Sequence, residues 1–206
     1  RDPKFSRSKR VLIKPNLLGA FPIERAVTTH PLVVEALIKY FLARKKEVWV
    51  GDSPGGTVSV SKVWNSSGLQ DLADRYPIRL INLSKHPFKE MKFNGIPLKI
   101  SDALFQCGIV INVAKYKTHS LTAFTGALKN LYGLVPGMVK SEYHRMYPDT
   151  RSFAELLLAV YGVCRSKISY SIIDGIIGMD GAGPSGGKPQ NFGLLMGSSS
   201  IPALDT

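Results

Sequence analysis

The sequence predicts an α/β fold, with a mainly parallel sheet flanked by helices in Rossmann-like layers and a small inserted β-hairpin. Short apolar runs typical of buried strands alternate with segments whose apolar residues recur at helical spacing. Gly, Pro or Asn follow most of the strand runs, as turns require. The 206 residues are 44% hydrophobic and 20% charged, which excludes wholesale disorder. We expect a single α/β domain over residues 1–206.

The first hundred residues supply three strands, two helices and the hairpin. Strands are expected over residues 11–13, 48–50 and 78–83, a helix up to about residue 43, a weaker helix over 69–75 and the hairpin over 91–100. Thr29 or His30 can cap the first helix, and Pro31 suits its first turn. Asn94 and Gly95 form the turn signal that predicts the hairpin.

The second half continues the alternation of strands and helices. Strands are expected over residues 108–113 (ending at Lys115), 168–173 and 192–196, and helices through Phe105, over 127–131 (stopping near Gly133) and over 153–163. Ser101 and Asp102 can cap the first of these helices, and Ser152 with Glu155 spells a capping box before the last. A glycine-rich loop is expected over residues 175–187.

The chain is strongly basic, with 27 Lys and Arg against 15 Asp and Glu and a net charge of +12. Nucleic acid, a membrane surface and small anions are the partners that such a charge can attract. The main clusters, from Lys4 to Arg10 and from Arg44 to Lys46, lie at the start of the chain and at a helix end, without interleaved aromatic residues. This pattern favours a solvated basic surface and no specific nucleic-acid site. No apolar run approaches the roughly 20 residues of a membrane span, so no membrane partner is expected.

The two cysteines, Cys107 and Cys164, lie among apolar residues and are expected to be small core side chains. No Cys-x-x-Cys occurs, so we expect that this chain does not itself ligate an iron–sulfur cluster. A reducing, cytoplasmic location fits this cysteine usage. Because the chain opens on Arg1, the sequence leaves open that it is part of a longer protein.

Polar residues follow four of the predicted strands. They are Lys14 and Asn16, then Asp52 and Ser53, then Lys115, Lys117 and His119, and finally Asp174. Any one of them alone is explained by a side chain reaching water. Because the carboxyl ends of parallel strands meet at one edge, where ligands bind in such sheets, the joint pattern predicts a site there.

The segment from Lys115 to His119 is a candidate for proton transfer. In an extended chain Lys115, Lys117 and His119 point to one side. Two ammonium groups beside an imidazole lower its pKa and keep it neutral, as a general base requires. The alternative is a basic loop that faces solvent.

The segment from Thr125 to Asn130 is a candidate anion site. Small residues at a helix start let a ligand approach the backbone N–H groups, which favour anions. Lys129 lies four residues after Thr125, on the same helix face, where it can clamp an anion or act as a covalent nucleophile. The alternative is a surface lysine.

Three other patterns carry no site. Gly181, Gly183 and Gly186 match a dinucleotide fingerprint by letter, but Pro184 interrupts the expected helix start. The loop 51–56 lacks the Gly-Lys-Ser/Thr of a P-loop. No His-x-x-x-His pair or carboxylate-rich cluster indicates a closed metal site.

Taken together, these motifs resemble the family called domain of unknown function 362. The matching segments are Lys14-Pro15-Asn16, Thr28 to Pro31, Gly51 to Gly56, Lys115 to His119, Thr125 to Gly133 and Asp174-Gly175-Ile176. Many members of that family join this domain to a ferredoxin-like module with iron–sulfur clusters. The resemblance therefore implies a possible ferredoxin-like partner domain.

A more distant resemblance is to the nickel-pincer lactate racemases. It rests on His119, Lys129, Pro136-Gly137 and His144. Carried over, His119 would be an acid/base, Lys129 would carry a nicotinate-derived pincer group and His144 would be a metal ligand. A second catalytic histidine of that family falls in a loop that here offers Asp52 and Ser53. The resemblance implies a nickel-pincer-like or other metal cofactor.

The sequence thus predicts a cofactor-dependent enzyme or redox protein acting on a small anionic organic molecule. In this hypothesis Lys14, Lys117 and Lys129 hold the anion, His119 moves a proton with help from Asp52, and His144 contacts a metal or the ligand. Asn16, Ser53, Asn130 and Asp174 complete the expected ligand-binding set. Two alternatives remain: an accessory module that docks a ferredoxin-like iron–sulfur domain, and a basic nucleic-acid binder.

Overall fold

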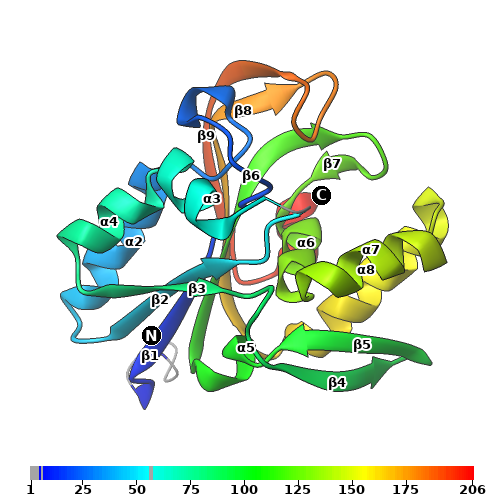
Figure 1. Cartoon of the computed structure of the whole chain (residues 1–206), viewed down its shortest axis with the longest axis horizontal. Helices are drawn as coiled ribbons and strands as arrows, with labels where there is room; N and C mark the ends of the chain where they lie inside the picture. The colour runs from blue at the N-terminus through cyan, green and yellow to red at the C-terminus, as the bar shows by residue number, and fades with distance from the viewer. Residues whose placement is uncertain (1–4, 6, 56–57) are drawn as a thin grey trace.

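The computed structural model describes residues 5, 7–55 and 58–206 (Figure 1). Lys4 of the N-terminal basic cluster and Gly56 of the loop after the second strand lie outside the described residues. A seven-stranded sheet forms the centre of the molecule, and helices cover both of its faces. The predicted α/β fold with a mainly parallel sheet is confirmed.

The strand order of the large sheet is β3-β2-β1-β6-β8-β9, with β7 paired to β6. Its strands are β1 (Arg10–Lys14), β2 (Glu47–Asp52), β3 (Ile78–Asn82), β6 (Ile109–His119), β7 (Ala123–Thr125), β8 (Ile168–Asp180) and β9 (Lys188–Ser198). The first three, β6 and β8 are parallel, whereas β7 and β9 run antiparallel to their neighbours. The carboxyl ends of β1, β2 and β6 therefore lie at one edge.

Helices pack on the two faces of the sheet through separate apolar clusters. On one face lie α2 (Pro31–Leu42), α3 (Val60–Ser66) and α4 (Leu69–Arg75). On the other lie α5 (Ala103–Gln106), α6 (Ala127–Asn130), α7 (Gly137–Met146), α8 (Thr150–Cys164) and α9 (Ile201–Asp205). Two short 3₁₀ turns, η1 (Ile23–Arg25) and η2 (Leu131–Leu134), complete the described elements.

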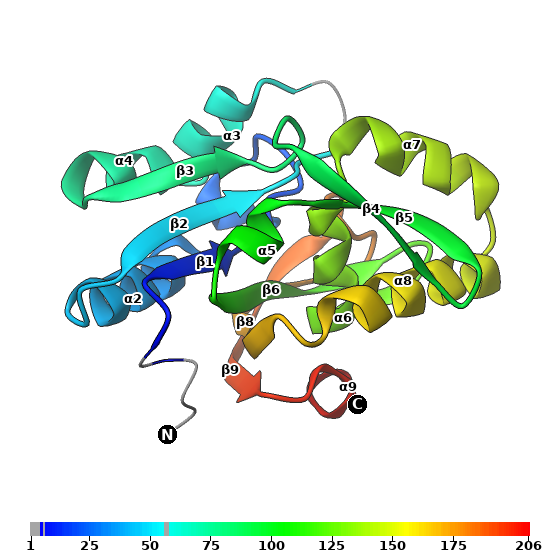
Figure 2. The same ribbon diagram turned by 90° about the horizontal axis from the view of Figure 1, so that it is seen from below.

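The predicted hairpin is a separate two-stranded sheet of β4 (Phe88–Phe93) and β5 (Ile96–Ser101). Asn94 and Gly95 form its turn with φ angles of 47° and 85°, which suit these two residue types. Figure 2 shows the hairpin lying along α8, which it contacts.

Two expected boundaries around β6 and β8 are wrong. The strand expected to end at Lys115 continues to His119, because β7 turns back and pairs with its last residues. The glycine-rich loop begins at Gly181, because residues 175–180 still belong to β8. A Cβ on Gly178 would lie 2.6 Å from the carbonyl oxygen of Tyr116, so glycine permits the close strand approach.

The predicted capping box before α8 is also wrong. The helix begins three residues earlier, and the Asp149 carboxylate accepts hydrogen bonds from the backbone N–H groups of Arg151 and Ser152. For α2 the cap is His30, whose side chain accepts from Leu32 N–H. Short polar acceptors at both positions satisfy donors of the first helical turn.

Part of the positive charge lies inside the fold. Lys14, Lys115 and Lys117 are each at most 1% exposed. The solvated basic surface inferred from composition therefore does not account for these three residues. Both cysteines are buried and free, as expected. In the described part of the chain, no helix combines the length and the apolar character that a bilayer crossing requires.

Candidate functional site

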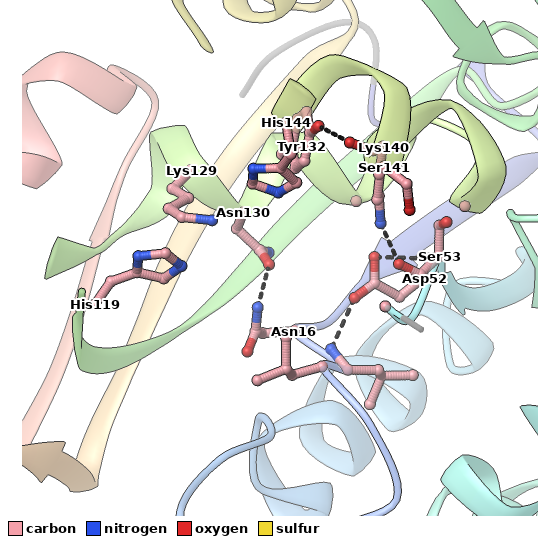
Figure 3. A pocket seen from close by; sticks show the side chains of 15 residues that line it. Asn16, Asp52, Ser53, His119, Lys129, Asn130, Tyr132, Lys140, Ser141 and His144 are labelled. Carbon is pink, nitrogen blue, oxygen red and sulfur yellow. Dashed lines mark hydrogen bonds between the residues drawn. The ribbon is translucent and has the colours of Figure 1, made fainter. Parts of the chain in front are cut away.

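A pocket of about 260 Å³ opens at the carboxyl ends of β1, β2 and β6, against α7 (Figure 3). It is lined by Asn16, Leu17, Leu18, Asp52, Ser53, Gly55, His119, Lys129, Asn130, Tyr132, Gly133, Gly137, Lys140, Ser141 and His144. This is the sheet edge at which parallel α/β folds bind ligands. The strand-end pattern in the sequence thus leads to an actual cavity.

Seven of the predicted site residues line this pocket, and three do not. Those in the lining are Asn16, Asp52, Ser53, His119, Lys129, Asn130 and His144. Lys14, Lys117 and Asp174 are buried beside or behind it, with protein partners of their own. The functional roles of all ten residues stay predictions.

Asp52, in the pocket lining, forms an ion pair with Lys14, which is buried behind it. Lys14 Nζ lies 2.8 Å from Asp52 Oδ1. The same carboxylate accepts hydrogen bonds from the backbone N–H groups of Leu17 (2.7 Å) and Ser53 (2.8 Å). With these three donors both carboxylate oxygens are occupied. Asp52 therefore holds β1 to the loop after β2, and its charge is already balanced by Lys14.

An amide cluster joins α6 to the strand ends. Asn130 Oδ1 accepts from Asn16 Nδ2 (3.1 Å) and Lys14 Nζ (3.3 Å), and Asn130 Nδ2 donates to Asn112 Oδ1 (2.8 Å). The sequence places these residues far apart, and the sheet brings them together. Asn16 Oδ1 is buried without a partner among the described residues.

His119 ends β6 and presents one ring nitrogen to the pocket. Its Nδ1 accepts the backbone N–H of Leu121 at 3.1 Å, which assigns the proton of the neutral ring to Nε2. Burial, followed by the charges of Lys129 and Lys117, lowers its pKa to about 3. The ring is therefore neutral, as predicted. His119 is poorly placed to act as the expected base, because Nδ1, the ring nitrogen that carries the lone pair, already accepts a hydrogen bond from Leu121.

His144, on α7, differs from His119 in that its ring nitrogens are not engaged by the backbone of the described residues. Its ring stacks on Phe153 with centroids 4.7 Å apart and meets Tyr132 edge-on at 5.5 Å. Within the described chain neither ring nitrogen has a hydrogen-bond partner. Burial, Lys129 and Lys140 lower the pKa of His144. A neutral imidazole held in this way offers a lone pair to a proton or to a metal.

Two lysines face the pocket without a carboxylate of their own. Lys129 Nζ has no hydrogen bond or ion pair among the described residues and lies 5.6 Å from the ring centroid of Phe153. Lys140 Nζ donates to the carbonyl oxygen of Ser53. Burial is the main cause that lowers the pKa of Lys129 to about 8 and that of Lys140 to about 7. Both groups are thus costly as free cations and favourable as partners of an anion.

Lys140, Ser141 and Tyr132 are pocket residues that the sequence reasoning missed. The available signal was the spacing of Lys140 and His144, which are four residues apart and share a face of α7. The helix itself was not predicted, because Tyr143 is its one buried residue and its apolar periodicity is weak.

The remaining predicted site residues have structural partners. Lys115 Nζ lies 2.8 Å from Asp174 Oδ2, which also accepts the backbone N–H of His30 at 2.8 Å. Lys117 Nζ donates to the carbonyl oxygen of Val27 at 2.7 Å. These contacts hold the segment before α2 against the ends of β6 and β8.

Metal-binding side chains are sparse. Among residues 5, 7–55 and 58–206, no cluster of three or more His, Cys, Asp or Glu side chains could hold a metal ion. The pocket offers His144 as one free imidazole. A metal there would need further ligands that the described side chains do not supply.

Comparisons with known proteins agree on family and fold. The family model described as "Domain of unknown function (DUF362)" matches residues 11–206. The curated "Thylakoid-associated protein sll1697" of Synechocystis sp. is 32% identical over 199 residues, covering 95% of this chain and 60% of that protein.

Two solved structures share the fold. The lactate racemase apoprotein from Thermoanaerobacterium thermosaccharolyticum has a TM-score of 0.60 at 14% identity, over 98% of this chain and 49% of that one. A Thermotoga maritima protein solved by a structural genomics consortium has a TM-score of 0.51 at 15% identity, over 89% and 49% of the two chains. The chain thus spans about three-fifths of its curated relative and about half of each solved one.

Proposed function

This chain belongs to the DUF362 family, and from the geometry of its pocket we propose that it is an enzyme that binds a small organic anion and transfers a proton to or from it. One observation carries the proposal. Lys129 and Lys140 face a cavity in which the described lining residues include one carboxylate, that of Asp52, and Lys14 already neutralises it. The described lining is therefore cationic and holds no further counter-ion.

A bound anion would offset the energetic cost of burying Lys129 and Lys140. A buried ammonium group without a partner loses hydration and gains little in return. Burial accordingly lowers the pKa of both lysines. A bound carboxylate or phosphate would supply charge and hydrogen-bond acceptors to both groups at once. The stabilisation would be larger here than on the surface, because the burial of both lysines weakens the screening by water.

The two histidines suit different tasks toward such a ligand. His119 would donate a hydrogen bond from Nε2 to a ligand oxygen, because Leu121 occupies Nδ1. His144 would accept the proton, because both of its ring nitrogens are free within the described chain and its lowered pKa keeps one of them unprotonated. This division replaces the earlier assignment of the base role to His119.

The resemblance to lactate racemases raises the question of an attached cofactor. Lys129 as a neutral amine is the nucleophile that covalent attachment would need, and its lowered pKa favours that form. An attached group would remove the ammonium that pairs with the anion, so attachment at Lys129 and anion binding by Lys129 are alternatives. His144 fits as a neighbouring metal ligand, whereas the described side chains do not fit a metal held by protein alone. A nicotinate-derived group would supply an electron-pair acceptor of the kind that nicotinamide cofactors supply. Orienting the substrate and moving its proton would remain with His119, Lys140 and His144.

Ligand-induced thermal stabilisation, followed by hydrogen exchange, tests the proposal. The solved lactate racemase makes 2-hydroxy carboxylates the first class to screen. We expect lactate or a homologue to raise Tm, and we expect Lys129→Met to abolish that rise. Lys62→Met, at an exposed position on α3, is the matched control and should leave the rise unchanged. The proposal fails if no carboxylate raises Tm, or if Lys129→Met and Lys62→Met behave alike.

Proton transfer needs its own measurement. With a ligand from that screen in deuterated water, NMR should detect deuterium replacing a carbon-bound hydrogen of the ligand. His144→Gln should lower the exchange rate by about 10²–10⁴-fold while leaving the Tm shift largely intact. Exchange that persists at the wild-type rate in His144→Gln would exclude His144 as the base.

A further inference from the structure

The pocket has a cationic group at each of two ends. Figure 3 shows Lys129 beside His119 and Asn130 at one end, and Lys140 beside Ser141 and Ser53 at the other. We propose that the ligand is a small dianion whose two acidic groups are held by Lys129 and Lys140. This inference rests on the proposed function and specifies its class of substrate.

The ring of Tyr132 lies near both lysines and limits how far apart their ammonium groups can be. Lys129 Nζ and Lys140 Nζ each lie 5.8 Å from the centroid of its ring. The two ammonium groups are therefore at most about 12 Å apart, as the triangle inequality requires of those two distances. A molecule with acidic groups at both ends of a short carbon chain can reach both lysines. The cavity of about 260 Å³ is below the usual size of sites for drug-sized ligands, which also favours a small molecule.

The end at Lys129 has several donors without partners. The ammonium group makes no hydrogen bond among the described residues, and His119 directs Nε2–H away from its contact with Leu121. These groups match an acidic group, which accepts several hydrogen bonds.

The end at Lys140 is built from a different part of the chain. Lys140 donates one hydrogen bond to the Ser53 carbonyl oxygen, which leaves two of its three N–H donors for a ligand. Ser53 Oγ and Ser84 Oγ lie 2.7 Å apart, and Ser141 lines the same wall. The donors that line this end, Lys140, Ser141 and Ser53, lie on α7 and the loop after β2, and Ser84 supports Ser53 from the loop after β3.

Charge balance decides between one acidic group and two. Because Asp52 is paired with Lys14, a monoanion would pair with only one of Lys129 and Lys140. The other lysine would stay without an ionic partner or release its proton. A dianion pairs with both and favours the protonated form of both, so the pocket should prefer a dianion to a monoanion of the same length.

The test compares acids that differ only in the second acidic group. Malonate, succinate and glutarate are titrated by calorimetry at pH 7 against propionate, butyrate and valerate, the monoacids of equal carbon number. We expect at least one diacid to bind at least about tenfold more tightly than its monoacid. Lys140→Met should abolish that preference by weakening the diacid, with the monoacid changed less than about threefold. Lys140→Arg keeps the positive charge and should retain the preference for the diacid. It is the control that separates the loss of charge from a folding defect in Lys140→Met.

Two results would overturn the inference, and they are distinguishable. Equal affinity for each diacid and its monoacid would contradict a dianionic ligand but leave an anion site in place. An equal loss of affinity for both acids in Lys140→Met would have the same meaning. If none of the six acids binds and the 2-hydroxy carboxylates also fail to raise Tm, the proposed function is removed as well.

Discussion

The Asp205 carboxylate accepts a hydrogen bond of 2.7 Å from the backbone N–H of Ala127, 78 residues earlier in the chain. Its other oxygen accepts from Leu128 N–H, also at 2.7 Å. Asp205 thus caps the short helix that carries Lys129. A Cβ on Gly126 would overlap this carboxylate, so the glycine makes room for it.

Removing this cap should destabilise the protein. We expect Asp205→Ala to lower the free energy of unfolding by about 1–2 kcal/mol, because two first-turn N–H groups lose their acceptor. Asp205→Asn should cost less, since its amide oxygen can still accept one of the two bonds. Urea denaturation measures both variants. An unchanged free energy of unfolding in Asp205→Ala would show that the carboxylate does not act as the cap.

The buried pair of Lys14 and Asp52 should be sensitive to the loss of either charge. We expect Asp52→Asn to lower the free energy of unfolding by about 3–5 kcal/mol, because it leaves a buried ammonium without its counter-ion. The double variant Asp52→Asn/Lys14→Met should recover part of that loss, because no unpaired charge remains. A double-mutant cycle in denaturant measures the coupling. Additive losses would mean that the pair contributes no mutual stabilisation.

Lys117 should make stability depend on pH in the alkaline range. Burial is the main cause that lowers its pKa from 10.5 to about 7. Between those two pH values the unfolded chain binds more protons at this site than the folded chain does. The free energy of unfolding therefore gains from Lys117 as pH rises, by up to about 1.4 kcal/mol per pH unit.

Replacing Lys117 should reduce that slope. Denaturation of Lys117→Met between pH 7 and 10 should show a shallower rise than the wild type, with the remainder coming from Lys129 and Lys140. Lys62→Met, at an exposed position, should keep the wild-type slope. A slope that is identical in all three proteins would contradict a lowered pKa for Lys117.

His119 should remain neutral and keep one tautomer across the ordinary pH range. Its pKa is lowered to about 3, and Leu121 N–H occupies its Nδ1. Nitrogen-15 NMR should therefore report a proton on Nε2 and no titration from pH 8 down to about 4.5. A midpoint near the usual histidine value of about 6.5 would refute both the burial and the tautomer assignment.

Paired substitutions separate the two nitrogens of His119. Gln places an amide donor near the position of Nε2, whereas Asn places an acceptor near the position of Nδ1. His119→Gln should therefore retain ligand-induced stabilisation better than His119→Asn. The reverse order would indicate that the Nδ1 acceptor, which holds the backbone N–H of Leu121, matters more for ligand binding than the Nε2 donor.

The sequence by itself determined the layered α/β fold and much of the pocket. Asn16, Asp52 and His119 were found because each follows or ends a predicted strand, and the carboxyl ends of β1, β2 and β6 meet at one edge in any sheet with this parallel order. Lys129 was singled out because small residues precede it at a helix start, but the reason was wrong, since Asp205 occupies the first N–H groups of that helix and Thr125 belongs to β7. These inferences use local patterns and the topology that alternating strands and helices impose.

Tertiary structure alone decided which of the charged side chains remain available to a ligand. Lys14, Lys115 and Lys117 are candidate site residues in the sequence, as Lys129 is, yet each is occupied by a partner at least 38 residues away. Lys140 and His144 enter the pocket because α7 packs its weakly patterned face across the strand ends. The tautomer of His119 depends on one backbone N–H. Strand register and packing set these pairings, and local spacing along the chain carries no information about them.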